Sequence, residues 1–268
     1  MKILILGDVM GSSGRKAIQE KLSKIIKKNQ IDFTIINGEN AADDGRGITK
    51  SIGDEFFMQG VDVITSGNHI WDKQETTDYI KEEIRLLRPA NLVEGSPGNG
   101  YGIYSTKNSK FKVGVINLMG NVFMRKTEDV FQIAKKIKDK IILKKNVDFI
   151  IIDFHGEITS EKMAMGHFFD GSSTGVVGTH THVPTADTRI LEKGTAYQTD
   201  IGMCGDYNSV IGMNKENSLK KFFKSKEAKN HFPADGEATL SGIIIEADHE
   251  TGLAKKITRL IEGGSLIK

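Results

Sequence analysis

The sequence contains little cysteine or proline, with one cysteine and four prolines in 268 residues. A lone cysteine, Cys204, excludes an intrachain disulfide and a metal site made only of cysteine. An excess of one charge sign is also absent, because 37 Lys and Arg oppose 35 Asp and Glu. Bulk charge therefore does not favour nucleic-acid binding. These features predict a cytoplasmic protein.

Long hydrophobic runs are missing as well. No uncharged apolar run approaches the roughly 18–20 residues that a membrane helix requires. The first apolar run meets an acid at Asp8 before it reaches the length of a signal-peptide core. We therefore expect neither a membrane span nor a signal peptide. Glycine, in contrast, is abundant with 29 residues, and glycine permits tight loops and close approach of the backbone to a ligand.

Short apolar runs alternate with helical patterns along the chain. Runs typical of buried strands cover residues 3–6, 33–36, 61–64, 113–118, 149–152 and 175–178. Apolar residues at helical spacing predict helices around 18–26, 52–57 and 130–141, and shorter strand-like pieces follow at 189–191, 195–198 and 240–246. The alternation predicts a layered α/β fold. Without a composition break or linker, we expect a single domain over residues 1–268.

Metal-competent side chains follow five of the expected strands, each beside a glycine-containing loop. They are Asp8, Glu39, Asn40, Asn68, His69, His155, His180 and His182. Ligand sites in α/β sheets lie beyond the carboxyl ends of the strands, so these residues can converge. Carboxylate, amide and imidazole groups without thiolate suit iron, manganese or zinc. This set contains more ligands than one tetrahedral ion can bind, so the sequence predicts two metal ions that share a carboxylate.

Each motif also has a structural interpretation. Asp8 could cap a helix, and Glu39 with Asn40 could simply be a polar loop. The Asn-His pair at residues 68–69 could satisfy backbone groups of a turn. His180 and His182 would lie on one side of the chain if it were extended. Their joint placement at strand ends favours a metal site over these separate explanations.

The order of the motifs resembles the signature of calcineurin-like binuclear metallophosphoesterases, which reads Asp-x-His, Gly-Asp, Gly-Asn-His, His and Gly-His-x-His. This chain departs from it at Met10 in the first-motif His position, at Glu39 in place of the bridging Asp, at Ile70 after Gly-Asn-His, and at Thr179 before His180. These departures are similar to those of the YmdB-type subfamily, and the similarity runs along the whole chain.

The resemblance implies a β-sandwich core flanked by helices, with the metal site at the carboxyl ends of the strands. One divalent ion would be held by Asp8, Glu39, Asn40 and His182, and the other by Glu39, Asn68, His155 and His180, with His69 as the proton donor. Iron is the expected metal, with manganese or zinc as alternatives. The implied activity is a phosphodiesterase acting on 2′,3′-cyclic and also 3′,5′-cyclic nucleotides.

Two other functional classes remain open from the sequence. Gly7, Gly11 and Gly14 lie between a strand and a helix, although their spacing differs from a dinucleotide-binding fingerprint and Asp8 would repel a pyrophosphate. A metal-bound regulatory protein that binds nucleotide or RNA with little turnover is the second alternative, because Met10 and Glu39 depart from the wider family pattern.

Two further features concern substrate and partners. Arg46, between two glycines, could contact a substrate phosphate, since a guanidinium matches phosphate oxygens. A solvated loop charge is the other interpretation of this residue, and the favoured one. The basic and aromatic segment 220–224 predicts a helix with its aromatic residues inward, and contact with RNA is the alternative. His167, His231 and His249 are expected to be structural or exposed. By analogy with other α/β phosphoesterases we expect a homo-oligomer.

Overall fold

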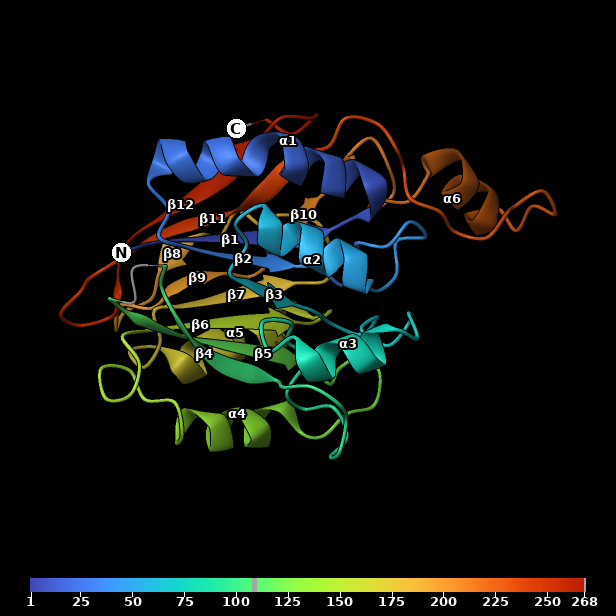
Figure 1. The fold of residues 1–268 in the computed structure, drawn as a ribbon. Coiled ribbons are helices and arrows are strands. Elements are labelled where there is room, and N and C mark those ends of the chain that lie inside the picture. Colours follow the sequence, from blue (N-terminus) through green and yellow to red (C-terminus); the bar gives the residue numbers. More distant parts are fainter. Residues whose placement is uncertain (108–109, 268) are drawn as a thin grey trace.

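Two β-sheets lie face to face in the computed structural model, which describes residues 1–107 and 110–267 (Figure 1). The first sheet contains, in spatial order, β12 (Ala254–Glu262), β11 (Leu240–Ala247), β1 (Lys2–Val9), β2 (Phe33–Asn37) and β3 (Val63–Thr65), and β10 (Met203–Cys204) pairs with β1. The second contains β4 (Tyr101–Ser105), β5 (Lys112–Met119), β6 (Phe149–His155), β7 (Gly175–Thr179), β9 (Ala196–Gln198) and β8 (Arg189–Ile190). The helices are α1 (Gly11–Asn29), α2 (Lys50–Met58), α3 (Thr76–Glu82), α4 (Val130–Lys138), α5 (Thr159–Phe169) and α6 (Lys215–Phe222).

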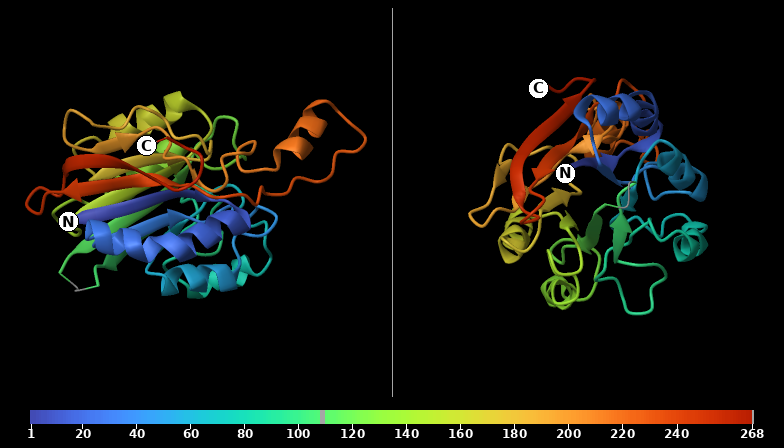
Figure 2. Two further views of the ribbon diagram at one scale, coloured as in Figure 1. Left: turned by 90° about the horizontal axis from the view of Figure 1, so that it is seen from above. Right: turned by 60° about the vertical axis from the view of Figure 1, so that its left-hand side comes forward.

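Three apolar clusters lie between the layers. Side chains of both sheets form the central cluster, including Ile5 of β1 and Val115 of β5. A second cluster joins the first sheet to α1 and α2 through residues such as Leu22 and Phe56. A third joins the second sheet to α4 and α5, with Met165 among its members. The layers therefore run helix, sheet, sheet, helix (Figures 1 and 2), which confirms the predicted α/β fold with a sandwich core.

Helix α1 illustrates how the sequence pattern specifies burial. Ile18, Leu22 and Ile25 recur at helical spacing and are buried against the first sheet. Each such side chain contributes about 1.5–3 kcal/mol through the apolar surface that it removes from water. The helix ends at Gln30, which adopts a left-handed conformation with φ of 56° and donates its N–H to the last turn. Burial and capping together fix the position of this helix on the sheet.

The carboxyl ends of the parallel strands meet at one edge of the sandwich. Strands β1, β2 and β3 are mutually parallel, as are β5, β6, β7 and β9. The two sheets are joined at this edge by Asn37 at the end of β2, whose Nδ2 donates to Asp153 Oδ2 of β6 at 3.0 Å. Loops that follow strands of different sheets are thereby brought together, on the side of Figure 1 away from the N-terminus.

Several sequence expectations need correction. Strand β1 continues through Asp8 to Val9, and α1 is capped by Met10, so Asp8 does not cap a helix. The helix expected to reach residue 141 ends at Lys138. Strands β4, β10 and β12 and helices α3 and α5 were not expected. Strands β4 and β12 are half-exposed and therefore give no continuous apolar run.

The orientation of α6 is the clearest correction. This helix stands away from the sandwich, on a long excursion between β10 and β11 (Figures 1 and 2). Its terminal aromatic residues, Phe222 and Phe223, are 77% and 83% exposed, and Leu219 is also exposed. The expectation of inward aromatic residues is therefore wrong. Helical periodicity identifies an apolar face but does not show whether another element of the chain covers it.

Among the described residues, no helix combines the length and the apolar composition that crossing a membrane would need. Cys204 is fully buried, and burial raises the pKa of its thiol to about 12. This agrees with its interpretation as a small apolar side chain rather than a nucleophile. His167, His231 and His249 are exposed, as expected.

Candidate metal centre

Asp8 reaches the edge because β1 contains an irregularity. The register of β1 against β2 shifts between Leu6 and Asp8, so Gly7 is an extra residue. Such a bulge redirects the side chain that follows it. Gly7 packs on the backbone of Gly202, where a Cβ would collide, so this position requires glycine. Asp8 is fully buried as a result, and its Oδ2 accepts a hydrogen bond from the His180 N–H at 3.1 Å.

Glu39 follows β2 and lies at the centre of the cluster. Its Oε1 is 2.9 Å from His155 Nε2, and its Oε2 accepts a hydrogen bond from the His69 N–H at 3.1 Å. Gly67, after β3, faces both side chains, and a Cβ at this position would overlap Glu39 Oε2 and His155 Nε2. Glycine at residue 67 therefore leaves space in the middle of the cluster.

Glu39, His155 and His180 form the tightest group. One nitrogen or oxygen atom from each lies within 4.8 Å of the others. His180 Nδ1 is 3.0 Å from His155 Nε2, and Asn68 Oδ1 is 3.1 Å from the same nitrogen. A carboxylate, an amide oxygen and two imidazoles suit a borderline divalent ion. The structure thus brings together the four residues expected to share one ion.

Asn40, His182 and Asp8 form a second group of potential ligands. Asn40 Oδ1 is 3.2 Å from His182 Nε2, and both residues are buried. Asp8 interacts electrostatically with His182, His155 and Glu39. The four residues expected to hold the other ion therefore converge from β1, β2 and the turn after β7.

One ring nitrogen of each histidine has a hydrogen-bond partner outside the proposed ligand set. These pairs are His155 Nδ1 with Thr179 Oγ1 at 2.9 Å, His180 Nε2 with Glu157 Oε2 at 3.1 Å, and His182 Nδ1 with the Ile211 carbonyl at 2.8 Å. An acceptor at the outer nitrogen keeps the proton there and leaves the inner lone pair available for a cation. The three tautomers therefore suit metal ligation.

The two histidines after β7 do not lie in an extended segment. His180 and His182 have φ of 99° and 65°, so both adopt left-handed conformations. Non-glycine residues adopt this conformation rarely and at a cost in free energy. The turn aims His180 at His155 and His182 at Asn40. It therefore sends the two imidazoles to different ligand groups.

Charges in the cluster are strongly coupled. Burial lowers the pKa of His155, but the charge and hydrogen bond of Glu39 outweigh burial and raise it. Burial raises the pKa of Glu39, and the His155 interaction more than reverses this. Burial and the His155 charge lower the pKa of His180, whereas burial raises that of Asp8. A proton on His155 thus balances the carboxylate charge in the metal-free chain, a role that a bound cation would take over.

His69 lies beside the cluster with its ring oriented by an acid. His69 Nδ1 is 2.8 Å from Asp72 Oδ2, and Asp72 Oδ1 is 3.4 Å from Arg125 Nη2. With Nδ1 engaged by Asp72, Nε2 is the ring nitrogen left to face a substrate. The geometry therefore suits transfer of a proton at Nε2.

The donor set fits a divalent cation, because Glu39, His155 and His180 each bring a ligand atom within 4.8 Å of the others. Asp8 Oδ1 is one of four buried side-chain nitrogen or oxygen atoms that lack a hydrogen-bond partner within the described part of the chain. An orphaned buried carboxylate oxygen is costly unless a cation or donor compensates for it. Glu39 contacts His155 directly and interacts electrostatically with Asp8. The absence of cysteine favours iron, manganese or zinc held by nitrogen and oxygen.

The structure places Arg46 at the surface, in agreement with a solvated loop charge, and Met10 in the core. Arg46 is exposed on the loop between Glu39 and α2, outside the buried ligand groups. Met10 is buried and packs against glycines, including Gly45 and Gly212, so it is a core residue. Gly14 packs on the Cys204 carbonyl. Close packing therefore explains this glycine, and the dinucleotide-loop alternative gains no support.

Sequence reasoning missed the residues that orient the ligands. Thr179 donates to Asp153 Oδ1 at 2.7 Å, and Asp153 also accepts from Thr65 at 2.5 Å and from Asn37. Asp153 lies two residues before His155 and therefore on the same face of β6. The two-residue spacing could therefore have identified Asp153 from the sequence as a neighbour of the ligand His155. The partners Thr179, Glu157 and Asp72 carried no comparable signal, because their roles depend on contacts between distant segments.

Comparisons with known proteins extend these observations. The family described as YmdB-like protein matches residues 4–260. The 2′,3′-cyclic-nucleotide 2′-phosphodiesterase of Bacillus subtilis (strain 168) is 47% identical over 263 residues, covering 97% of each chain. A crystal structure of a hypothetical protein from Thermus thermophilus has a TM-score of 0.89 at 34% identity and covers 99% of this chain and all of that one. A Mycoplasma pneumoniae crystal structure described as a novel phosphatase has a TM-score of 0.88 at 36% identity, covering 98% and 94%. Agreement in sequence and fold along nearly the entire length shows that this chain belongs to the YmdB-like protein family.

Proposed function

We propose that this chain is a metal-dependent phosphodiesterase that opens cyclic nucleotides, with 2′,3′-cyclic nucleotides as the first substrates and 3′,5′-cyclic nucleotides as further ones. The observation that carries the proposal is the ligand geometry. His155, His180 and His182 each engage one ring nitrogen outside the ligand set. Their other ring nitrogens lie 2.9 Å from Glu39 Oε1, 3.0 Å from His155 Nε2 and 3.2 Å from Asn40 Oδ1, respectively. The printed activity of the Bacillus subtilis relative supports the substrate class.

The proposed centre holds two divalent ions, iron first, with manganese or zinc as alternatives. One ion would be held by Asp8, Glu39, Asn40 and His182, and the other by Glu39, Asn68, His155 and His180. Bound there, the ions would neutralise phosphate charge and acidify the attacking water. Elemental analysis of protein purified without added metal tests this, and fewer than about two ions per fully active chain would contradict a binuclear centre.

The chain's own residues would complete the reaction. The water gives a proton to solvent as its oxygen bonds to phosphorus, the bond from phosphorus to O2′ breaks, and His69 gives its Nε2 proton to O2′. His69 then regains a proton from solvent. Asp72 orients His69 through Nδ1 at 2.8 Å. Arg46, on the exposed loop after Glu39, is the proposed contact for a substrate phosphate oxygen.

His69→Ala tests the proton donor directly. We expect this variant to retain both metal ions and to lose about 10²–10⁴-fold in kcat, the usual contribution of a positioned acid. Turnover of a 2′,3′-cyclic nucleotide panel, with metal content measured on the same samples, provides the readout. Activity equal to the unmodified chain would remove His69 from the mechanism.

A metal-bound regulatory or nucleotide-binding protein is the alternative. Turnover of bis-p-nitrophenyl phosphate with added manganese distinguishes the two, because a binder would keep both ions and release no nitrophenol.

We also propose two partners for this chain: a second copy of itself, in a homo-oligomer, and RNA, in contact with α6 and the residues that follow it. Charge reversal at Lys220, Lys221 and Lys224 should weaken single-stranded RNA binding, and unchanged binding would exclude that contact.

A further inference from the structure

A buried ion pair lies behind the turn that carries His180 and His182. Lys162 of α5 and Asp200, after β9, are both almost fully buried, with exposed side-chain fractions of 1% and 0%. Lys162 Nζ donates to Asp200 Oδ2 at 2.7 Å. Charged side chains are rarely buried in this way, because their desolvation is costly unless they are paired and fully hydrogen-bonded. Neither residue belongs to the proposed ligand set or to the proton donor.

Asp200 also accepts two hydrogen bonds from the turn and one from the segment that follows it. Its Oδ2 accepts from both the N–H and the Oγ1 of Thr181, at 3.1 and 2.7 Å. Its Oδ1 accepts from the Gly202 N–H at 2.8 Å. A single carboxylate thus fixes the backbone and the side chain of the residue that separates His180 from His182.

Such a restraint matters because the turn is strained on both sides of Thr181. His180 and His182 both adopt left-handed conformations, which non-glycine side chains keep only when their surroundings enforce them. Because Thr181 is the only residue between them, fixing it constrains the directions of both imidazoles. The hydrogen bonds of the outer nitrogens orient the rings, whereas Asp200 holds the backbone from which the rings extend.

Lys162 reaches Asp200 across β7. Its stem passes Gly178, where a Cβ would lie 2.9 Å from Lys162 Cδ and would also collide with the Thr199 carbonyl. The glycine before the histidine turn therefore admits the lysine that balances Asp200. This arrangement links α5, β7 and the loop after β9 at a single point behind the ligands.

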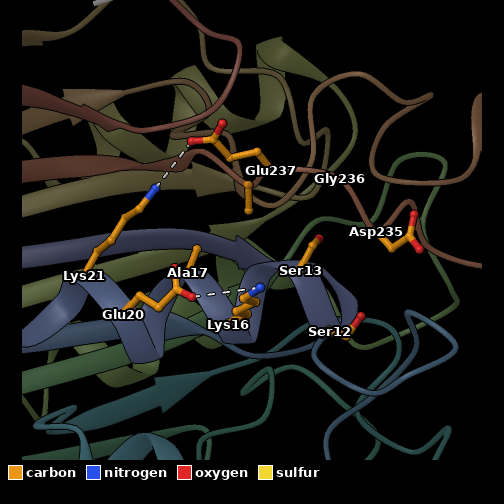
Figure 3. A pocket seen from close by; sticks show the side chains of 10 residues that line it. Ser12, Ser13, Lys16, Ala17, Glu20, Lys21, Asp235, Gly236 and Glu237 are labelled. Carbon is orange, nitrogen blue, oxygen red and sulfur yellow. Dashed lines mark ion pairs between the residues drawn. The ribbon is translucent and has the colours of Figure 1, made fainter.

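A cavity beside α1 shows no buried, unpaired charge that would indicate a second site. The cavity between α1 and residues 235–238, about 390 Å³ in volume, is lined by Ser12, Ser13 and several charged side chains (Figure 3). Its lysines are already engaged, since Lys16 lies 4.0 Å from Glu20 and Lys21 lies 4.0 Å from Glu237. Both lysines of the lining thus have an acidic partner, and no buried charged group is aimed into the cavity.

We infer that Asp200, with its charge balanced by Lys162, is a positioning residue that holds Thr181 and thereby presets His180 and His182 for two different metal ions. This inference rests on the metal-binding part of the proposed function. It assigns the buried pair to the geometry of the centre rather than to the stability of the fold alone.

Metal affinity of the full chain tests the inference. Four samples are stripped of metal with chelator and titrated with Mn²⁺ by calorimetry: the unmodified protein, Asp200→Asn, Thr181→Val and Thr181→Ser. Cobalt absorption spectra report ligand geometry, and thermal unfolding of the metal-free samples reports the fold. We expect Asp200→Asn to bind about 10–100-fold more weakly with an altered cobalt spectrum, as for other groups that orient ligands. Thr181→Val should weaken binding less, and Thr181→Ser, which keeps both hydrogen bonds, should bind like the unmodified chain.

Asp187→Asn provides the matched control. Asp187 accepts hydrogen bonds from Thr185 and Thr199 on the neighbouring segment without contacting Thr181. The Asp187→Asn variant should change thermal stability without changing the cobalt spectrum. Equal affinity and spectra for unmodified protein, Asp200→Asn and Thr181→Val would overturn the inference. Failure of the unmodified protein to bind Mn²⁺ or Co²⁺ would instead contradict the proposed metal centre. If Asp200→Asn does not fold, the comparison of Thr181→Val with Thr181→Ser decides the matter.

Discussion

At the scale of single residues, the proposed metal centre depends on a small residue, Gly67, as much as on the side chains that would bind the metal. Gly67 borders both Glu39 and His155, and a methyl group there would overlap their inner atoms. The backbone at this residue cannot retreat freely, because the nearby His69 N–H is bonded to Glu39. The identity of this glycine is therefore set by the space between two proposed ligands.

We predict that Gly67→Ala reduces metal binding more than it reduces stability. The added methyl should displace Glu39 or His155, lower the metal content below two ions per chain and cost about 1–3 kcal/mol through overpacking. Metal analysis and urea unfolding measure the two effects. Gly95→Ala is the control for metal content. A Cβ there meets no atom within 4 Å, so the variant should lower stability only through its φ of 84° and keep both ions. Full metal content in Gly67→Ala would show that the space is not needed.

The Glu39–His155 pair gives the metal-free protein a pH-dependent stability. The pKa of His155 is raised to about 9 in the folded chain, because Glu39 outweighs the lowering effect of burial. A raised histidine pKa stabilises the fold fully below the unfolded value of about 6.5 and loses this effect as pH rises through the folded value. We therefore predict that metal-free protein loses up to a few kcal/mol between about pH 6.5 and 9.

Thermal unfolding between pH 6 and 9.5 checks this prediction. Samples with chelator should show a falling midpoint across the window, whereas samples saturated with Mn²⁺ should not follow the same decline, because ligation needs the neutral imidazole. Parallel curves for the two samples would contradict a proton-for-metal exchange at His155.

At the scale of elements, α1 and α6 show opposite relations between pattern and packing. In α1 the apolar stripe is buried against the first sheet. In α6 the apolar residues Leu219, Phe222 and Phe223 are exposed. The two helices therefore differ in what they contribute to the stability of an isolated chain.

We predict that the double substitution Phe222→Ser and Phe223→Ser changes the free energy of unfolding by less than about 0.5 kcal/mol. Leu22→Ala, the reference for a covered side chain, should lower it by about 2–5 kcal/mol. Urea unfolding at several protein concentrations measures both. A concentration-dependent loss in the α6 variant would instead show that a second copy covers this face, in line with the proposed homo-oligomer.

The strand-end motifs were predictable from the sequence, and their partners were not. Asp8, Glu39, Asn68 and His155 each follow an apolar run, and parallel strands must end at a common edge. Thr179, Glu157 and Asp200 act through hydrogen bonds that join distant segments, which no local pattern encodes. The left-handed turn at His180 and His182 could not be predicted from the sequence for the same reason, since contacts with the distant Asp200 hold it.

At the scale of the whole molecule, the central apolar cluster takes side chains from both sheets. Neither sheet can be removed without exposing the inner face of the other. We therefore propose that residues 1–268 form one domain and predict a single cooperative unfolding transition. Fluorescence of Trp71, the only tryptophan, and far-ultraviolet circular dichroism should give the same midpoint with metal removed. Separate midpoints would indicate two independent units.

The α6 excursion also determines where a protease would meet this chain. Residues 215–229 carry six lysines, several of them exposed, on a segment that stands clear of the sandwich. Exposed segments of this kind are preferred sites of nicking, so trypsin should cut here first. Every proposed ligand lies before such a cut and β11 lies after it, yet β11 pairs with β1 along most of its length. The two fragments should therefore remain associated after digestion and keep the metal centre intact.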